Sequence, residues 1–128
     1  MKAGGRFRVV LVTCASLDEA RRIARNVVTK RLAACVNVVR TPVESLYTWK
    51  DKLETAREHL LLIKTTGKRL PQLEKEVCRL HSYDVPEFLA LEVSAGSSKY
   101  LSWLAASIGI TRSANSVALR SKHKRKAF

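Results

Sequence analysis

The order of the expected strands and helices constrains this fold more than any other feature of the sequence. Val9–Thr13 is a short apolar run rich in β-branched residues, which predicts a buried strand. Apolar residues at helical spacing follow from Leu17, and Ala33–Val39 predicts a second strand. The same succession recurs later, with its elements expected at Leu60–Lys64, Lys68–His81 and Phe88–Val93. The chain therefore contains two strand–helix–strand units.

The first helix carries signals at both of its ends. Ser16 and Glu19 fit a capping box, in which the serine hydroxyl accepts from an early helix N–H and the glutamate reaches back to the cap. Lys30 and Arg31 lie in the expected last turn, where positive charge suits the helix dipole. The sequence therefore predicts a helix that begins near Leu17 and includes Lys30 and Arg31.

The two units together predict an α+β fold with one antiparallel sheet. Right-handed crossovers place both helices on the same face of that sheet. This is the split βαβ, or ferredoxin-like, arrangement. A last helix, capped by Ser97 or Ser98, follows the second unit.

A long hairpin joins the two units. Ala33–Thr66 is extended throughout, with a break expected at Pro42 and a turn at Lys50-Asp51-Lys52. An arm of about fifteen residues spans roughly 50 Å at ~3.3 Å per residue. A domain of this size cannot cover such an arm, so its edges should pair with another chain. The hairpin therefore predicts an oligomer.

The 128 residues suit one domain with two flanking segments. We expect a flexible lead-in over residues 1–8, a folded domain over 9–110 and a disordered tail over 111–128. The chain carries a net charge of +13, and its tail holds basic residues and no acidic one. The basic residues of the tail are Arg112, Arg120, Lys122, Lys124, Arg125 and Lys126. Arg120, Lys122, Lys124, Arg125 and Lys126 favour weak contact with a polyanion, and a merely solvated tail is the alternative.

The cysteines and the hydrophobic runs predict a cytoplasmic protein. No run approaches the ~20 apolar residues of a membrane span, and no signal peptide is recognised. Three cysteines form a poor disulfide framework, so free thiols in a reducing compartment are expected. Cys35 and Cys78 are expected to be small buried apolar residues.

Several sequence blocks resemble one known family when they are read in order. The blocks are Val12-Thr13-Cys14, Arg31 to Asn37, Ser45-Leu46-Tyr47 with Trp49, Lys64-Thr65-Thr66, His81 with Tyr83, Val85-Pro86-Glu87, and Tyr100 to Leu104. They resemble the CutA (divalent-cation tolerance) family from about Arg8 to Ile108. Ser82 departs from the proline usual at its position, and Asp51 departs from the usual glycine.

The resemblance implies both a structure and a function. It implies a ferredoxin-like fold and a tight homotrimer whose long hairpins pair between subunits. It also implies binding of divalent cations, especially copper as Cu(II), and a role in cation tolerance. The fold further resembles that of the trimeric PII signalling proteins.

Cys14, His81 and Glu87 are the candidate metal ligands. They end the first strand, end the second helix and open the last strand, so they can converge in this fold. A thiolate beside an imidazole favours soft or borderline ions such as Cu(I), Cu(II) or Zn. His81 could instead only complement the helix dipole, and Glu87 could pair with Lys64 or an arginine.

A cleft between subunits is the second candidate site. Its expected members are Trp49, Lys64, Thr65, Tyr83 and Trp103. Lys64 and Thr65 offer charge and a hydroxyl to an anion, which would suit a PII-like sensor of a small anion or nucleotide. The aromatic side chains could instead only pack the trimer. No nucleophile or acid–base pair is recognised, so we expect a binding protein and not an enzyme.

Overall fold

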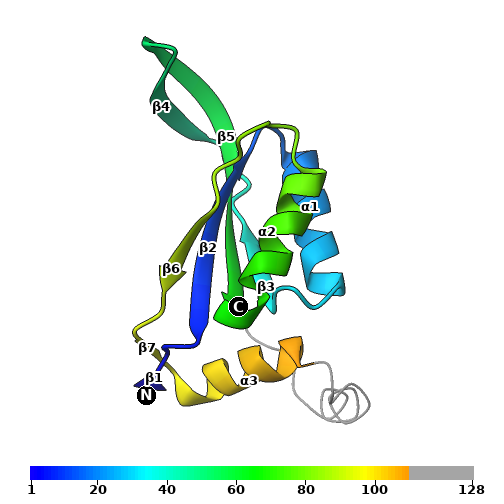
Figure 1. Ribbon diagram of the computed structural model, residues 1–128. Helices are drawn as coiled ribbons and strands as arrows, with labels where there is room; N and C mark the ends of the chain where they lie inside the picture. Colours follow the sequence, from blue (N-terminus) through cyan, green and yellow to red (C-terminus); the bar gives the residue numbers. More distant parts are fainter. Residues whose placement is uncertain (110–128) are drawn as a thin grey trace.

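The computed structural model describes residues 1–109, which form an α+β domain with one main sheet (Figure 1). Four strands make up its body, namely β2 (Phe7–Cys14), β3 (Cys35–Val38), β5 (Lys52–Thr66) and β6 (Leu89–Glu92). Helices α1 (Leu17–Thr29) and α2 (Leu70–Leu80) cover one face of the sheet. A short 3-10 turn, Gly67–Arg69, leads into α2. Helix α3 (Ser98–Ile108) lies across the end of the sheet, away from the hairpin.

The strand order confirms the ferredoxin-like arrangement. The four strands follow the order β3-β5-β2-β6, and every pair is antiparallel. Strand β2 lies in the middle, with Leu11 opposite Leu62 on one side and Leu89 on the other. The two strand–helix–strand units are thus interleaved in one sheet, as the element order predicts.

The long hairpin extends beyond the sheet. Strand β4 (Val43–Trp49) pairs only with the outer part of β5, from Lys52 to Glu58. No strand is assigned over residues 39–42, which agrees with the break expected at Pro42. Lys50 and Asp51 close the turn with φ angles of 52° and 65°. Both residues adopt the left-handed conformation that a two-residue hairpin turn requires.

The core lies between the sheet and its two helices. The side chains of β2 and β5 alternate, so every second residue faces α1 and α2. The large apolar residues that are fully buried there are Val10, Val12, Ile23, Val27, Leu61, Ile63, Leu73 and Val77. A second cluster, formed by Phe7, Leu101, Leu104 and Ile108, packs α3 against the end of the sheet.

The ordered structure begins earlier than expected. Residues 1–8 were expected to form a flexible lead-in, yet strand β1 (Lys2–Ala3) pairs with β7 (Ala95–Gly96), and Phe7 is buried. Gly4 packs closely on Val93, since an added Cβ would lie 2.6 Å from the Val93 carbonyl oxygen. The tail expected over residues 111–128 lies outside the described residues.

The end of α1 also differs from the expectation. The helix stops at Thr29, so Lys30 and Arg31 are not in its last turn. Arg31 has a φ of 59°, and the N–H groups of Arg31 and Leu32 donate to Val28 and Val27. This is the Schellman motif, with an arginine where glycine is usual. The sequence does not reveal this end of the helix, because arginine is a good helix former.

Candidate metal centre

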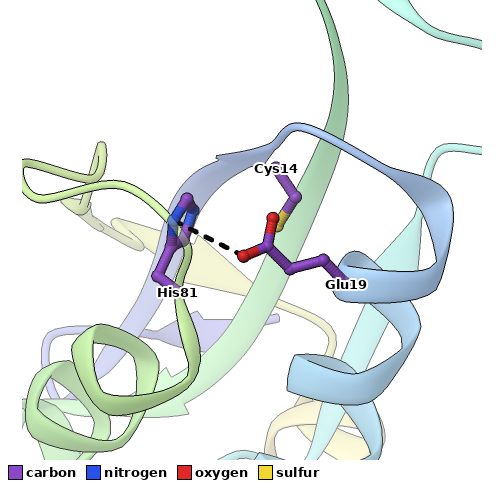
Figure 2. A group of neighbouring side chains, drawn as sticks. All are labelled: Cys14, Glu19 and His81. Carbon is purple, nitrogen blue, oxygen red and sulfur yellow. Dashed lines mark ion pairs between the residues drawn. The ribbon is translucent and has the colours of Figure 1, made fainter.

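Cys14, Glu19 and His81 come together at the end of the sheet nearest the hairpin (Figure 2). Their sulfur, carboxylate and imidazole atoms all lie within 4.8 Å of one another. Cys14 ends β2, Glu19 lies in the first turn of α1, and His81 directly follows α2. The side chains of Cys14 and His81 are fully buried, and that of Glu19 is 7% exposed. We call these three residues the Cys–Glu–His cluster.

Glu19 is a helix cap whose carboxylate also holds a distant loop. Its N–H donates to Ser16 Oγ at 3.1 Å, as the capping box predicts. Its carboxylate accepts from the N–H of Ala15, and from both the N–H and the hydroxyl of Ser82. The sequence predicts this cap but not the place of Glu19 beside Cys14 and His81, because glutamate side chains are mostly exposed.

The hydrogen bonds of His81 indicate which nitrogen of its ring carries a proton. Nε2 lies 2.8 Å from the carbonyl oxygen of Thr13, which can only accept, so Nε2 carries the proton. Nδ1 accepts from the N–H of Tyr83 at 3.0 Å and lies 3.9 Å from a carboxylate oxygen of Glu19. His81 therefore does more than complement the dipole of α2, since its ring connects the loop after α2 to β2 through hydrogen bonds.

Cys14 is a protonated thiol at neutral pH. Its burial, together with the nearby carboxylates of Glu19 and Glu58, raises its pKa to about 12. A metal ion binds the thiolate, so binding here must release the thiol proton.

The cluster fits a borderline metal ion in its donor types and spacing. Sulfur, imidazole nitrogen and carboxylate oxygen together suit Cu(II) or Zn. The free lone pair of His81 is on Nδ1, and an ion there would replace the hydrogen bond from Tyr83. Nε2 would keep its bond to Thr13 and hold the ring in place.

Glu87 is not part of this cluster. It lies exposed just before β6, and no ion pair among the described residues joins it to Lys64 or an arginine. Partial burial and then the carboxylate of Glu58 raise the pKa of Glu87. Within one chain, the carboxylate that lies beside Cys14 and His81 is that of Glu19.

Tyr83 and Glu58 adjoin the cluster. The Tyr83 hydroxyl donates to Glu58 at 2.9 Å, and its ring lies 4.8 Å from that of His81. Burial, followed by Glu58, raises the pKa of Tyr83. Glu58 was not predicted, because its burial depends on the loop that crosses the base of the hairpin.

One chain alone does not gather the residues of the expected cleft. Thr65 is fully buried, and its hydroxyl donates to the Leu32 carbonyl at 2.7 Å. Lys64 donates to the side chain of Asn37. Trp49 ends β4 at the hairpin tip, whereas Trp103 lies on α3 at the opposite end of the domain.

The other two cysteines are less buried than expected. Cys35 is half-buried and Cys78 is exposed. Cys78 follows the buried Val77 on α2, and one residue along a helix turns the side chain away from the core. Within the described residues, no helix has the length and apolar character needed to cross a membrane.

Comparison with known proteins places the chain in a family. Residues 8–107 match the family model described as CutA1 divalent ion tolerance protein. The chain is 45% identical over 101 residues to the divalent-cation tolerance protein CutA of Thermus thermophilus, which covers 79% of this chain and 97% of that protein. It is 44% identical over 96 residues to the chloroplastic protein CutA of Arabidopsis thaliana, and this match covers 75% of the chain but only 52% of the plant protein.

A solved structure agrees with this assignment. The CutA1 structure from Oryza sativa superposes with a TM-score of 0.77 at 40% identity, covering 83% of this chain and 96% of the rice chain. The family match spans most of the chain, and the Thermus relative matches over almost its whole length. The chain therefore belongs to the CutA1 divalent ion tolerance protein family.

Proposed function

We propose that the protein binds a divalent metal ion, copper as Cu(II), in a role in cation tolerance, and that it is not an enzyme. The observation that carries this proposal is the convergence of a thiol, an imidazole and a carboxylate within 4.8 Å in a buried place. The family description supports a role in divalent-ion tolerance. Sulfur and nitrogen donors favour copper over the hard ions Mg²⁺ and Ca²⁺.

Each residue of the cluster has a distinct role in this proposal. Cys14 gives up its proton and supplies the soft donor. His81 binds through Nδ1 while its Nε2–H bond to Thr13 orients the ring. Glu19 supplies the oxygen donor from a position held by Ala15 and Ser82. Glu87 is the alternative oxygen donor, reaching in from the exposed loop.

A copper titration with matched variants tests the site. Cu(II) is added anaerobically to the full chain and followed by calorimetry and by the thiolate-to-copper absorption band. The Cys14→Ala, His81→Ala double variant should lose both signals, whereas Cys78→Ala, His123→Ala should keep them. Glu19→Gln should weaken binding by at least about tenfold and Glu87→Gln should not, since loss even of a hydrogen-bond partner of a metal ligand commonly costs 10–100-fold.

Two results would contradict the proposal. Wild-type binding by Cys14→Ala, His81→Ala would refute the site. Failure of the unmodified protein to bind Cu(II) would refute the function. A loss in Glu87→Gln but not in Glu19→Gln would assign the oxygen donor to Glu87.

We also propose that the protein is a homotrimer. The sheet face turned away from the helices, which we call the open face, is mostly apolar: beside the polar Lys64 and Asn37 it carries Val9, Leu11, Leu60, Leu62, Leu89 and Leu91. Leu89 and Leu91 are 54% and 49% exposed on the edge strand β6. Leu53 on the bare hairpin is 69% exposed. Apolar surface of this kind, beside an unpaired strand edge, supports burial against other copies.

Light scattering after size-exclusion chromatography tests this assembly. We expect a mass three times the 14.4 kDa of the chain. Leu89→Lys should reduce the mass, because a charge on the open face opposes its burial. Val28→Lys changes an exposed apolar residue on α1 and should leave the mass unchanged. A monomer in the unmodified protein would refute the trimer.

A cytoplasmic location is part of the proposal. All three cysteines are free, which suits a reducing compartment. A plant relative is named chloroplastic, so the compartment needs its own test. Fractionation of cells that express the tagged protein would give it directly.

A further inference from the structure

The Cys–Glu–His cluster is closed to solvent in this structure. The side chains of Cys14 and His81 are fully buried, and that of Glu19 is only 7% exposed. A metal ion can therefore reach the three donor atoms only if some part of the protein around them moves.

The loop between α2 and β6 is held beside the cluster by few hydrogen bonds. It crosses the base of the hairpin and has no regular secondary structure (Figure 1). Within residues 1–109, its stretch 82–87 forms four hydrogen bonds, all donated by Ser82 and Tyr83. Cys14 and Glu19, in contrast, are fixed by the backbone bonds of a strand and a helix. The loop therefore breaks the fewest hydrogen bonds when it moves, so it is the segment that can open the cluster.

Tyr83 makes three contacts that hold this loop in place. Its N–H donates to His81 Nδ1 at 3.0 Å, and its ring lies 4.8 Å from the His81 ring. Its hydroxyl donates to the Glu58 carboxylate at 2.9 Å. Glu58 is only 7% exposed, and in the part of the chain that the structure describes its carboxylate accepts from Tyr83 alone. Tyr83 thus connects one donor of the cluster, His81, to the base of the hairpin.

The hydrogen bond from Tyr83 and a metal ion exclude each other at His81. Nδ1 of a neutral imidazole with its proton on Nε2 has one lone pair, and the Tyr83 N–H occupies it. A carboxylate has about four lone-pair positions, so Glu19 can bind an ion and still accept from Ser82. Metal binding therefore requires Tyr83 to withdraw, whereas Ser82 can stay bonded and act as the hinge.

If the cluster is the metal site proposed above, we propose that Tyr83 is its latch, and that an ion binds only after Tyr83 has left both His81 and Glu58. The hydroxyl bond to the buried Glu58 carboxylate favours the closed state, because hydrogen bonds to charged groups are the strong ones. The apparent affinity for an ion is reduced by the fraction of molecules that are open. A weakened latch should therefore let the protein bind metal faster and more tightly.

Tyr83→Phe tests the latch, because it removes only the hydroxyl that reaches Glu58. Hydrogen exchange in the metal-free full chain, followed by NMR, reports opening at the N–H of residue 83. We expect exchange there to be about tenfold faster, since a hydrogen bond to a charged group commonly shifts an equilibrium by at least that factor. The amides of Val10 and Leu11, in the middle of the sheet, should exchange at an unchanged rate.

Copper uptake provides the second measurement. Cu(II) is mixed anaerobically with the full chain in a stopped-flow instrument, and the thiolate-to-copper absorption band is followed. Tyr83→Phe should gain this band about tenfold faster than the unmodified protein, in proportion to its larger open fraction. Tyr47→Phe removes the same hydroxyl from a side chain that is 46% exposed on β4, and it should match the unmodified protein in both measurements.

Three results would overturn the latch. They are unchanged exchange at residue 83 of Tyr83→Phe, unchanged copper uptake by that variant, and a rise in exchange that is equal at residue 83, Val10 and Leu11. The last of these would show a general loosening of the domain. Faster exchange at residue 83 alone, in a protein that binds no Cu(II), would support the opening of Tyr83 and refute the metal function proposed above.

Discussion

Cys14 differs from the other two thiols in burial and in charge environment. Its pKa of about 12 keeps it protonated, while Cys78 is exposed on α2. Iodoacetamide reacts with thiolates, so at pH 8 we expect rapid labelling of Cys78 and almost none of Cys14. Mass spectrometry of tryptic peptides measures both rates, and urea-unfolded protein, in which all three cysteines react, is the control. Equal rates in the folded protein would contradict the buried position of Cys14.

Ser82 contributes two of the donors that hold the Glu19 carboxylate. Ser82→Pro removes both the N–H and the hydroxyl, whereas Ser82→Ala removes only the hydroxyl. Loss of one hydrogen-bond donor to a buried carboxylate lowers the free energy of unfolding by about 1–3 kcal/mol. We therefore expect Ser82→Pro to be the less stable variant in urea denaturation. Equal stability of the two variants would show that the Ser82 N–H is not needed.

At the residue scale, the sequence predicted two members of the cluster and missed the third. Cys14 and His81 end a predicted strand and a predicted helix, so the topology brings them together. Glu19 was recognised only as a cap, because its second role depends on Ser82, 63 positions away in the chain. The sequence instead favours Glu87, because that residue lies at the start of the last expected strand. Such contacts between loops follow no periodic pattern and cannot be read from spacing.

An ion pair that should respond to pH joins α2 to Lys30, the residue directly after α1. Glu76 accepts from Arg79 and from Lys30, both at 2.8 Å, and these bonds lower its pKa to about 2. A lowered pKa means that the unfolded chain binds a proton more readily than the folded one. The stabilisation is therefore complete above about pH 4.5, the ordinary value, and is lost as the pH falls toward 2.

Thermal unfolding of Glu76→Gln between pH 2 and pH 7 measures this contribution. We expect a lower Tm than that of the unmodified protein at pH 7, and a difference that shrinks below pH 4.5 as Glu76 becomes protonated. Glu74→Gln, at an exposed position on the same helix, should show little difference at any pH. A Tm difference for Glu76→Gln that does not change with pH would contradict the role of this charge.

At the element scale, the sequence predicts the strands and helices that have a clear apolar period, and it does not predict the shortest strands. The main strands and helices bury alternate or helically spaced apolar residues, which is what the sequence displays. Strands β1 and β7 contain two residues each, too few to show a period. They pair residues that lie more than 90 positions apart in the chain, so their pairing cannot be read from a local pattern.

At the scale of the whole molecule, assembly should make stability depend on concentration. If the open face is buried only in the trimer, dilution favours separate and less stable chains. We expect the Tm to rise with protein concentration in calorimetry. The Tm of Leu89→Lys should be lower and nearly independent of concentration. A constant Tm for the unmodified protein under reversible conditions would indicate that the open face is not buried between copies.

The pairing of β1 with β7 has a practical consequence for handling the protein. It brings the first residues of the chain to the same end as α3, so both boundaries of the described domain lie opposite the hairpin (Figure 1). A tag fused before Met1 or joined after Gly109 would therefore project from that end. Attached to a sensor surface by either tag, the molecule would turn its hairpin, and the end of the sheet that contains the buried Cys–Glu–His cluster, toward the solution.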